Sequence, residues 1–343
     1  MATLAPPMHT PRTTTAIAAL RPGPVDAPDS FATVELELPP IGPHDLLVDV
    51  RAVSVNPVDV KVRASFDPAG APKVLGFDAS GVVVATGAEV TRFVVGDEVV
   101  HAGSIARPGT NAGLHVVDER VTGPKPTSLT HAEAAALPLT AITAWEVLFD
   151  RLGLTAASTG TLLVVGGAGG VGSMVTQLAR ARTGLTVVAT AARPESQEWA
   201  TAMGAHHVVD HADLVAAVRA VAPDGVDHVV SAYSDGNVEA YAELLPLHGT
   251  VVAVDDPVGL DLVPLKPKSQ GWLWEFMFAR PLHRPEDAYQ HDLLVEVARL
   301  VDAGSLRTTA RTTLTGITEE NLRAAHRQVE SGGVVGKVVL ARG

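Results

Sequence analysis

The sequence contains no cysteine, which excludes disulfide bonds, thiolate ligands for a metal and a cysteine nucleophile. Aromatic residues are also scarce at 4% of the chain, and charged residues make up only 19%, whereas hydrophobic residues make up 46%. This balance is typical of a globular protein with a sizeable core. Because 343 residues exceed what one ordinary core accommodates, we expect two domains.

Basic residues are outnumbered by acidic ones, and the net charge of −12 argues against a nucleic-acid partner. No apolar run has the length of a membrane span, so we expect no membrane partner either. Residues 1–11 lack the apolar core of a signal peptide and are predicted to form a loose tail. Because the chain has no cysteine, redox chemistry does not indicate its compartment. The cytoplasm is therefore the default location.

The part of the chain from Thr13 to about Pro138 alternates short β segments with glycine and proline, which predicts a β-rich, partly barrel-like domain. Thr130 and Glu133 have the spacing of a capping box at the start of a helix. Pro138 interrupts that helix, and residues 139–152 are predicted to form a second one that leads into the next domain. The clearest β segments are 31–38, 45–53 and 81–85.

From Gly160 onward, predicted strands and helices alternate, which indicates βαβ units and a parallel sheet. After residue 256 this alternation stops, and a helix over 288–303 and a closing strand over 334–340 follow. The predicted strands are 161–165, 186–190, 207–210, 226–231 and 250–254, and the helices between them are 195–203, 213–221 and 237–245.

A glycine-rich turn joins the first of these strands to a helix and has the pattern Gly167-x-Gly169-x-x-Gly172. In a dinucleotide site the first glycine permits the turn, the second lets the backbone approach a pyrophosphate, and the third lets the helix pack on the strand. The helix N-terminus, with Gly170 and Val171, would face the phosphates. The strand–turn–helix setting therefore predicts a bound dinucleotide.

The end of the second strand indicates which dinucleotide is bound. An acidic residue there usually binds the ribose 2′-hydroxyl of NAD, but this chain has Ala191. Arg193 and Ser196 follow and could bind a 2′-phosphate, for which the planar guanidinium is well suited. The alternative is that Arg193 is a solvated loop residue and that Glu195 simply begins a helix. The combination favours NADPH.

Aromatic residues gather in one proline-rich segment, where Trp272, Trp274, Phe276 and Phe278 fall within seven residues. Such a cluster suggests a lid or pocket wall for an apolar, planar substrate. An interdomain or subunit packing patch explains it equally well.

The sequence resembles the medium-chain dehydrogenase/reductases, and within them the zinc-independent quinone oxidoreductase-like branch. The resemblance covers nearly the whole chain and implies an α/β fold with a GroES-like, β-rich catalytic domain and a Rossmann domain with a doubly wound parallel sheet. The catalytic domain would span residues 1–138 and 283–343, the NADPH-binding Rossmann domain 139–282, and the active site would lie between them. The motifs that carry the resemblance are 55–59, 74–81, 94–99 and 166–172, and those typical of a subgroup often labelled zinc-type alcohol dehydrogenase-like are 107–111, 137–145 and 274–278.

The zinc label of that subgroup conflicts with the residues present. Zinc alcohol dehydrogenases of the superfamily have a cysteine where this chain has Asn56, and Gly-His-Glu where it has Gly76-Phe77-Asp78. Catalytic zinc needs three protein ligands, and neither Asn56 nor Phe77 is a suitable one. We therefore expect no bound metal.

The resemblance also places candidate catalytic residues. Asn56, Asp59 and Lys61 come from the segment that lines the cleft in relatives, and a lysine could oppose negative charge on a carbonyl oxygen. The alternative for Lys61 is a surface residue paired with Asp59 or Asp67. Further candidates are Thr140 and Thr143 near the nicotinamide, Lys337 near the coenzyme, and Phe77 with the aromatic cluster at the substrate.

These residues lead to one main functional hypothesis, an NADPH-dependent reductase that transfers hydride to a small, apolar, electron-poor acceptor such as an enone, an enal or a quinone. The alternatives are an alcohol/carbonyl dehydrogenase and a non-catalytic NADPH-binding or redox-sensing protein. We also expect a homodimer built on the nucleotide domain, with residues 250–255 near the edge of its sheet.

Overall fold

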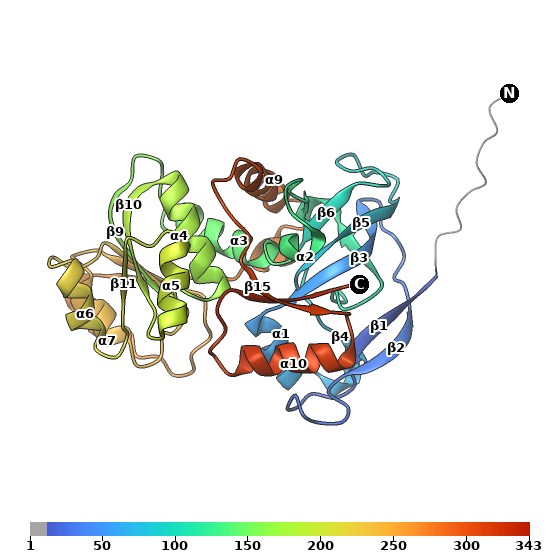
Figure 1. Ribbon diagram of the computed structural model, residues 1–343, viewed down its shortest axis with the longest axis horizontal. Coiled ribbons are helices and arrows are strands. Elements are labelled where there is room, and N and C mark those ends of the chain that lie inside the picture. Colours follow the sequence, from blue (N-terminus) through green and yellow to red (C-terminus); the bar gives the residue numbers. More distant parts are fainter. Residues whose placement is uncertain (1–11) are drawn as a thin grey trace.

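The structure, a computed structural model, describes residues 12–343, so the tail predicted at 1–11 lies outside the described residues. A β-rich unit and a unit built on a parallel sheet lie side by side, at the right and left of Figure 1. This arrangement confirms the predicted α/β fold class.

The β-rich unit contains a seven-stranded sheet and a three-stranded sheet. Its strands are β1 (Thr13–Ala19), β2 (Ala32–Glu37), β3 (Asp45–Val55), β4 (Lys73–Val74), β5 (Ala79–Thr86), β6 (Glu98–His101), β7 (Leu114–Asp118), β8 (Thr122–Pro124), β15 (Ala310–Thr315) and β16 (Lys337–Ala341), and its helices are α1 (Pro57–Ser65), α2 (His131–Ala134) and α10 (Glu319–Glu330). The larger sheet has the order β15-β16-β3-β5-β6-β8, with β7 also paired to β3. Strand β3 is buried along most of its length, where leucine and valine side chains face the core, and only Asp49 and Arg51 interrupt this burial. The end of the chain therefore completes a sheet that the first half begins.

The second unit has a six-stranded sheet in the order β11-β10-β9-β12-β13-β14, and all its pairings are parallel. Its elements are β9 (Thr159–Val165), α4 (Gly170–Arg182), β10 (Gly184–Thr190), α5 (Pro194–Ala202), β11 (His207–Val209), α6 (Leu214–Val221), β12 (His228–Ser231), α7 (Val238–Leu244), β13 (Thr250–Ala253) and β14 (Gly271–Trp274). Along β9, Leu162 and Val164 face one core cluster while Leu163 and Val165 face another. Burial of both faces explains why these strands are continuous apolar runs.

Helix α3 (Pro138–Trp145) joins the two units and continues into a π-helical stretch, Glu146–Arg151. As predicted, the helix that begins after Thr130 ends before Pro138 and a second helix follows; Pro138 lies in the first turn of α3, where the missing N–H costs no hydrogen bond. Helix α9 (Tyr289–Asp302) packs on α3 and β8, after the short α8 (Ala279–His283). The helical stretch 131–151 is long and apolar enough to span a membrane by composition alone, but 78% of its most apolar window is buried inside the structure.

The sheet edge lies elsewhere than predicted. Strand β13 pairs with β12 on one side and β14 on the other, so residues 250–255 are inside the sheet. The edge strand is β14, whose aromatic sequence we had interpreted as a lid or patch. This strand was missed because a 3₁₀ stretch, Val263–Lys268, rather than a regular helix, precedes it.

Two buried glutamates connect α3 to the segment after β14. The side chains of Glu146 and Glu275 are 2% and 1% exposed. Arg280 Nε lies 3.1 Å from Glu146 Oε1, and Arg151 Nε lies 2.8 Å from Glu275 Oε2. Burial and the neighbouring Glu275 carboxyl raise the pKa of Glu146 well above the usual range of a glutamate. Glu146 therefore keeps its proton to a higher pH than an exposed glutamate does.

Glu146→Gln should change how stability depends on pH. Because the folded state raises the pKa of Glu146, it holds a proton that the unfolded state releases, so this group's contribution to the free energy of unfolding falls as pH rises above the normal glutamate range. The variant lacks this decrease in the free energy of unfolding, which amounts to at most about 1.4 kcal/mol per pH unit. Urea unfolding from pH 5 to 8, with exposed Glu239→Gln as control, should show the variant gaining on the parent. Parallel curves of unfolding free energy against pH would contradict a raised pKa of Glu146.

Candidate active site

The glycine-rich turn between β9 and α4 has the form that a pyrophosphate site needs. A Cβ on Gly172 would lie 2.3 Å from the Gly166 carbonyl oxygen, and one on Gly167 would lie 2.6 Å from the Ala189 Cβ, so no side chain fits at either position. The N-cap of α4 is Gly169, which supplies no side-chain cap. The first N–H groups of α4, around Gly170 and Val171, are therefore left to bind an anion.

The residues predicted to contact the coenzyme ribose follow the end of β10. Ala191 is buried, and the side chain of Arg193 is exposed and donates a hydrogen bond to the Gly333 carbonyl. Ser196 accepts from the backbone N–H of Arg193 at 3.1 Å and donates to its carbonyl at 2.8 Å. Ser196 is thus engaged at the start of α5, whereas Arg193 keeps its guanidinium at the surface.

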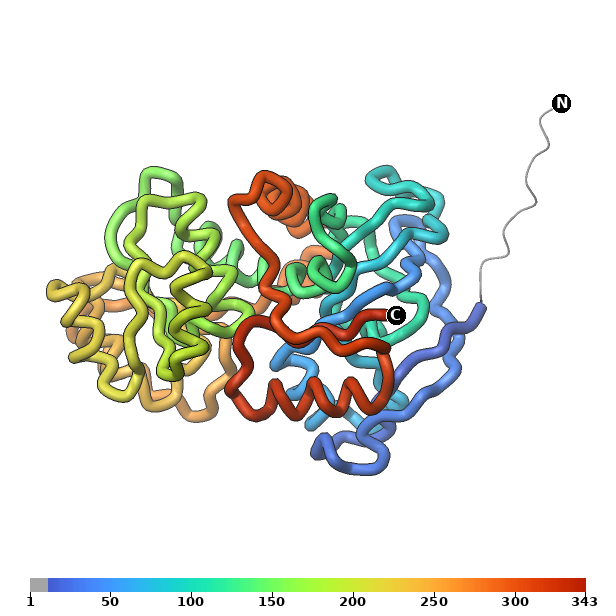
Figure 2. Tube along the Cα trace, in the orientation of Figure 1, coloured from blue at the N-terminus to red at the C-terminus, as the bar shows by residue number. Residues whose placement is uncertain are grey.

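The segment between α10 and β16 lies against the glycine-rich turn, as the red end of the trace in Figure 2 shows. The Gly336 N–H donates to the Ala168 carbonyl at 2.8 Å. A Cβ on Gly170 would lie 2.7 Å from Lys337 Cδ and 3.1 Å from Thr140 Cγ2. The first residue of β16 and helix α3 therefore both touch the start of α4.

Lys337 is buried and forms an ion pair with Asp78, which is fully buried. The distance from Lys337 Nζ to Asp78 Oδ2 is 3.0 Å, and the same ammonium donates to Asn56 Oδ1. Asp78 also accepts from Ser54 Oγ and Asn56 Nδ2 at 2.8 Å, and from the Leu139 N–H at 2.7 Å. Donors on every side are what a buried charge requires.

Asp59 holds the two segments of this network together. Its carboxylate accepts from the N–H groups of Asn56 and Gly76, both at 2.8 Å. Burial raises the pKa of Asp59 to about 7, opposed by those two N–H groups and by the charge of Lys337. Asp78 was not predicted as a site residue, and Asp59 was placed in the cleft segment without this role, although the Asn56-x-x-Asp59 spacing of a capping box could have indicated it.

Lys61 lies on α1 and reaches across to the parallel-sheet unit. Its Nζ is 2.6 Å from Oδ2 of Asp256, which follows β13, and the two side chains are 48% and 73% exposed. Asp59 is turned into the buried network, and Asp67 caps its own turn through the Ala69 N–H. The structure therefore gives Lys61 a different partner from the two considered in the sequence.

Thr140 and Thr143 use their hydroxyl groups within the helical chain. Thr140 Oγ1 donates to the carbonyls of Ala136 and Leu137 at 3.2 and 3.0 Å, and Thr143 Oγ1 donates to Leu139 at 2.8 Å. Such bonds are common for threonine inside a helix. Both side chains are buried, and Thr140 presents its methyl group to Gly170.

The predicted pocket aromatics divide into two groups. Phe77 is buried and lies edge-to-face with Phe278, with 5.2 Å between the ring centroids. Phe278 makes a similar contact with Phe276, with 5.4 Å between centroids. Trp272 packs on the core of the parallel sheet and touches Trp274 at 5.7 Å. Trp274 and Phe276 are 48% and 47% exposed. The structure therefore connects Phe276 to Phe77 but leaves the two tryptophans along the sheet edge.

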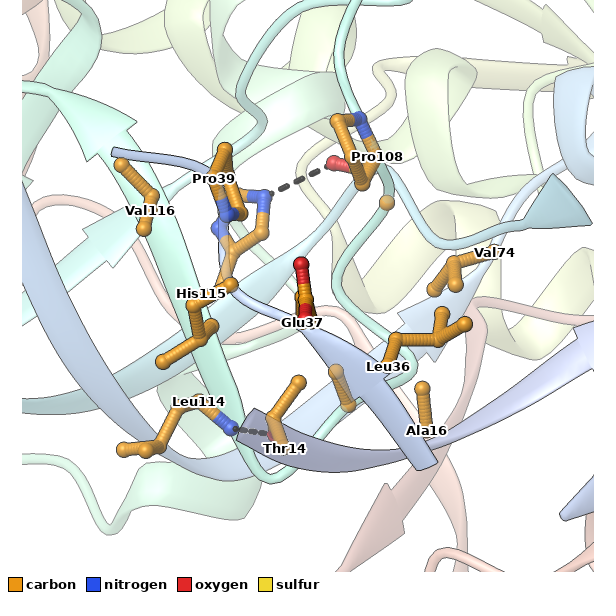
Figure 3. Close-up of a pocket in the computed structure, with 13 residues that line it drawn as sticks. Thr14, Ala16, Leu36, Glu37, Pro39, Val74, Pro108, Leu114, His115 and Val116 are labelled. Atoms are coloured by element: carbon orange, nitrogen blue, oxygen red, sulfur yellow. Dashed lines mark hydrogen bonds between the residues drawn. The ribbon is translucent and has the colours of Figure 1, made fainter. Parts of the chain in front are cut away.

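A small cavity of about 50 Å³ lies apart from these residues, beside β1 and β2 (Figure 3). His115 borders it and bonds to the Pro108 carbonyl at 3.0 Å. Its other lining residues are mostly apolar, and none is a predicted site residue.

Comparison with known proteins identifies the family. The model of the alcohol dehydrogenase GroES-like domain matches residues 42–138, and that of the zinc-binding dehydrogenases matches residues 203–340. The chain is 40% identical over 320 residues to a zinc-type alcohol dehydrogenase-like protein of Staphylococcus aureus, covering 90% of this chain and 94% of that protein. A solved structure from Rhizobium etli, named for zinc-dependent alcohol dehydrogenases, has a TM-score of 0.91 at 48% identity and covers 96% of this chain and 98% of that one.

The chain belongs to the medium-chain dehydrogenase/reductase superfamily. It is an oxidoreductase of that type, with a fold that binds nicotinamide dinucleotides. A 2-methylene-furan-3-one reductase of Solanum lycopersicum is 37% identical over 185 residues, which are 51% of this chain and 46% of that protein.

The zinc in the names of these relatives does not fit the donor groups of this medium-chain dehydrogenase/reductase. Asn56 is bonded through both side-chain atoms to Asp78 and Lys337, and Phe77 has no lone pair to offer. The Lys337 ammonium at this place would repel a cation. Within residues 12–343, no three His, Asp or Glu side chains are placed to hold a metal ion. We therefore derive no chemistry through zinc.

Lys337→Met should destabilise the protein by about 3–5 kcal/mol, because it leaves the Asp78 charge buried without a cation. Adding Asp78→Asn removes that charge, so the double variant should be more stable than the sum of the two single losses predicts. Urea unfolding of the parent and the three variants completes the cycle. If the two single losses of unfolding free energy add up to the loss in the double variant, Lys337 and Asp78 are not energetically coupled.

Proposed function

We propose that this protein is a zinc-independent, NADPH-dependent reductase of quinones or of the activated C=C bond of α,β-unsaturated ketones and aldehydes. The observation that carries the proposal is the Asn56–Asp78–Lys337 network, in which Asn56 stands where zinc dehydrogenases have a cysteine and is engaged with a buried aspartate and a lysine. Without a Lewis acid, alcohol/carbonyl interconversion lacks its activating group, whereas a conjugated acceptor is already electron-poor. The tomato relative supports this choice, since its named substrate carries a C=C bond conjugated to a ketone.

The residues of the chain supply binding and charge for this reaction. NADPH, when bound, supplies the hydride. Reduction of an enone at its β-carbon places negative charge on the carbonyl oxygen, and a fixed cation near that oxygen lowers the barrier. Lys61 reaches the carboxyl edge of the parallel sheet and is the residue we assign to that role. Its pairing with exposed Asp256 leaves the ammonium able to donate to a second oxygen, and water or Lys61 then protonates the α-carbon.

The choice of NADPH rests on the end of β10. Buried Ala191 brings no negative charge to the ribose position, and the exposed Arg193 guanidinium is available for a 2′-phosphate. The bond from Arg193 to the Gly333 carbonyl brings the side chain beside the segment between α10 and β16, which also contacts the glycine-rich turn. Arginine binds phosphate through parallel hydrogen bonds, and a 2′-phosphate could replace the neutral carbonyl as its partner.

Arg193→Ala should weaken NADPH binding by about 1.5–3 kcal/mol, the usual range for a hydrogen bond to a charged group, and leave NADH binding nearly unchanged. Isothermal titration with both coenzymes measures the difference. Arg219→Ala is the control, since Arg219 is also exposed but pairs with Glu243 between α6 and α7. Equal losses for NADPH and NADH would rule out the 2′-phosphate contact.

Lys61→Ala should lower enone turnover about 100- to 1000-fold, as loss of one charge-stabilising donor does elsewhere. NADPH affinity should hold, and quinones should lose less because they accept charge more easily. Lys266→Ala is the control, since that lysine is exposed on the 3₁₀ stretch before β14. An unchanged rate of enone reduction would show that backbone N–H groups or water, and not Lys61, stabilise the charge on the carbonyl oxygen.

A panel of acceptors tests the function as a whole. NADPH consumption with enones or quinones, none with alcohols and NADP, and sub-stoichiometric zinc by elemental analysis are the expected results. Activity on alcohols that is lost to a chelator and restored by zinc would establish the dehydrogenase alternative. Tight NADPH binding without turnover of any acceptor would establish a binding or sensing protein.

We further propose that the protein is a homodimer assembled through β14. This strand pairs with β13 on one side only within the described sheet, and its Leu273 and Trp274 are 36% and 48% exposed. An open, apolar strand edge favours pairing with its own copy around a two-fold axis.

Trp274→Glu should shift the protein from dimer to monomer, because it places two charges at the proposed interface. Light scattering at micromolar concentration measures the mass of both forms. Val94→Glu is the control, an equally drastic change at a valine that is 66% exposed in the β-rich unit. A monomeric parent protein would refute the assembly.

A further inference from the structure

Tyr233 is an exposed aromatic residue at the carboxyl edge of the parallel sheet, two residues after β12. Its side chain is 54% exposed, yet its ring lies against the glycine-rich turn. A Cβ added to Gly166 would be 2.9 Å from Tyr233 Cε2. The ring thus borders the place where the turn meets α4.

The loop that carries Tyr233 is held firmly. The Tyr233 carbonyl accepts from the hydroxyl of buried Tyr241 at 2.8 Å and from Asn237 Nδ2 at 2.9 Å. Its N–H donates to Ser231 Oγ at 3.2 Å. The next residue, Ser234, donates to Asp255 through its N–H and its hydroxyl, both at 2.6 Å. A braced backbone that leaves an aromatic ring exposed is typical of a binding residue rather than of core packing.

The topology of the sheet indicates which part of the coenzyme meets this ring. Strand β9 lies between β10 and β12, so the glycine-rich turn stands at the point where the strand order reverses. A dinucleotide lies across that point, with its adenosine ribose at the end of the second strand. Ala191 and Arg193 occupy the β10 side, and Tyr233 occupies the β12 side. The nicotinamide half therefore extends toward Tyr233.

We propose that the Tyr233 ring is a binding surface for the nicotinamide half of the coenzyme. Its face offers apolar contact to the ribose and the nicotinamide, and Gly166 gives it room to approach the pyrophosphate. This inference rests on the proposed coenzyme site but on neither the acceptor nor the preference for NADPH. It also assigns opposite ends of one ligand to Arg193 and Tyr233.

Binding of three probes separates those two ends in the full-length protein: NADPH, NADH and adenosine 2′,5′-bisphosphate, which lacks the nicotinamide half. Tyr233→Ala should weaken NADPH and NADH alike, by roughly three- to tenfold, and leave the bisphosphate unchanged. Arg193→Ala should show the complementary pattern, with the bisphosphate weakened and NADH unchanged. Tyr233→Phe keeps the ring and should keep most of the affinity.

Leu247→Ala is the control, an exposed apolar side chain in the turn before β13, at the opposite edge of the sheet. Thermal unfolding of each variant verifies that it is folded. The proposal is overturned if Tyr233→Ala weakens the bisphosphate as much as NADPH, if it weakens none of the probes, or if Tyr233→Phe loses as much as Tyr233→Ala. Absence of acceptor turnover would refute the proposed reductase without changing these binding results.

Discussion

The buried ion pair between Lys337 and Asp78 is the interaction on which the site depends. Taking two charges out of water costs several kcal/mol for each, and only close, complete partnering offsets that cost. The partners come from the end of β3, the start of β5, helix α3 and the first residue of β16, so none of these elements can shift alone. The aliphatic stem of Lys337 also forms the surface against which Gly170 packs. The need to pair these two buried charges thus fixes the position of the large β-rich sheet relative to the glycine-rich turn.

The parts of the fold that short stretches of sequence encode were predicted well. The valine-rich strands and the turn at Gly167, Gly169 and Gly172 are local features, since each element shows its own periodicity or its own steric need for glycine. The edge strand β14 was missed because nothing local distinguishes it. Its pairing with β13 makes it a strand, and a tryptophan-rich run after several prolines is compatible with a loop as well.

The site was predicted only in part, for a related reason. Candidate residues could be named from their motifs, but their partners lie far along the chain. Lys61 meets Asp256 after 195 residues, and Lys337 meets Asp78 after 259. Asp78 and the role of Asp59 were overlooked because the function of a carboxylate becomes clear only when its hydrogen-bond donors are known. Composition cannot show either pairing. The first depends on how the two units pack together, and the second depends on how β16 joins the large sheet of the β-rich unit.

The order of the sheet strands also has a consequence for how the chain folds during synthesis. Strands β15 and β16 are made last, yet they pair next to β3, which is made among the first. Until they emerge from the ribosome, the end of β3 at residues 52–55 lacks its partner on one edge, and this open strand edge is a place where aggregation can start. The parallel-sheet unit lies between these two portions of the chain and contains all its own strands, so it can fold first. Closure of the β-rich sheet then requires the synthesis of β16, and a protein that lacks β16 would lose both the link between β15 and β3 and the lysine that the buried Asp78 requires.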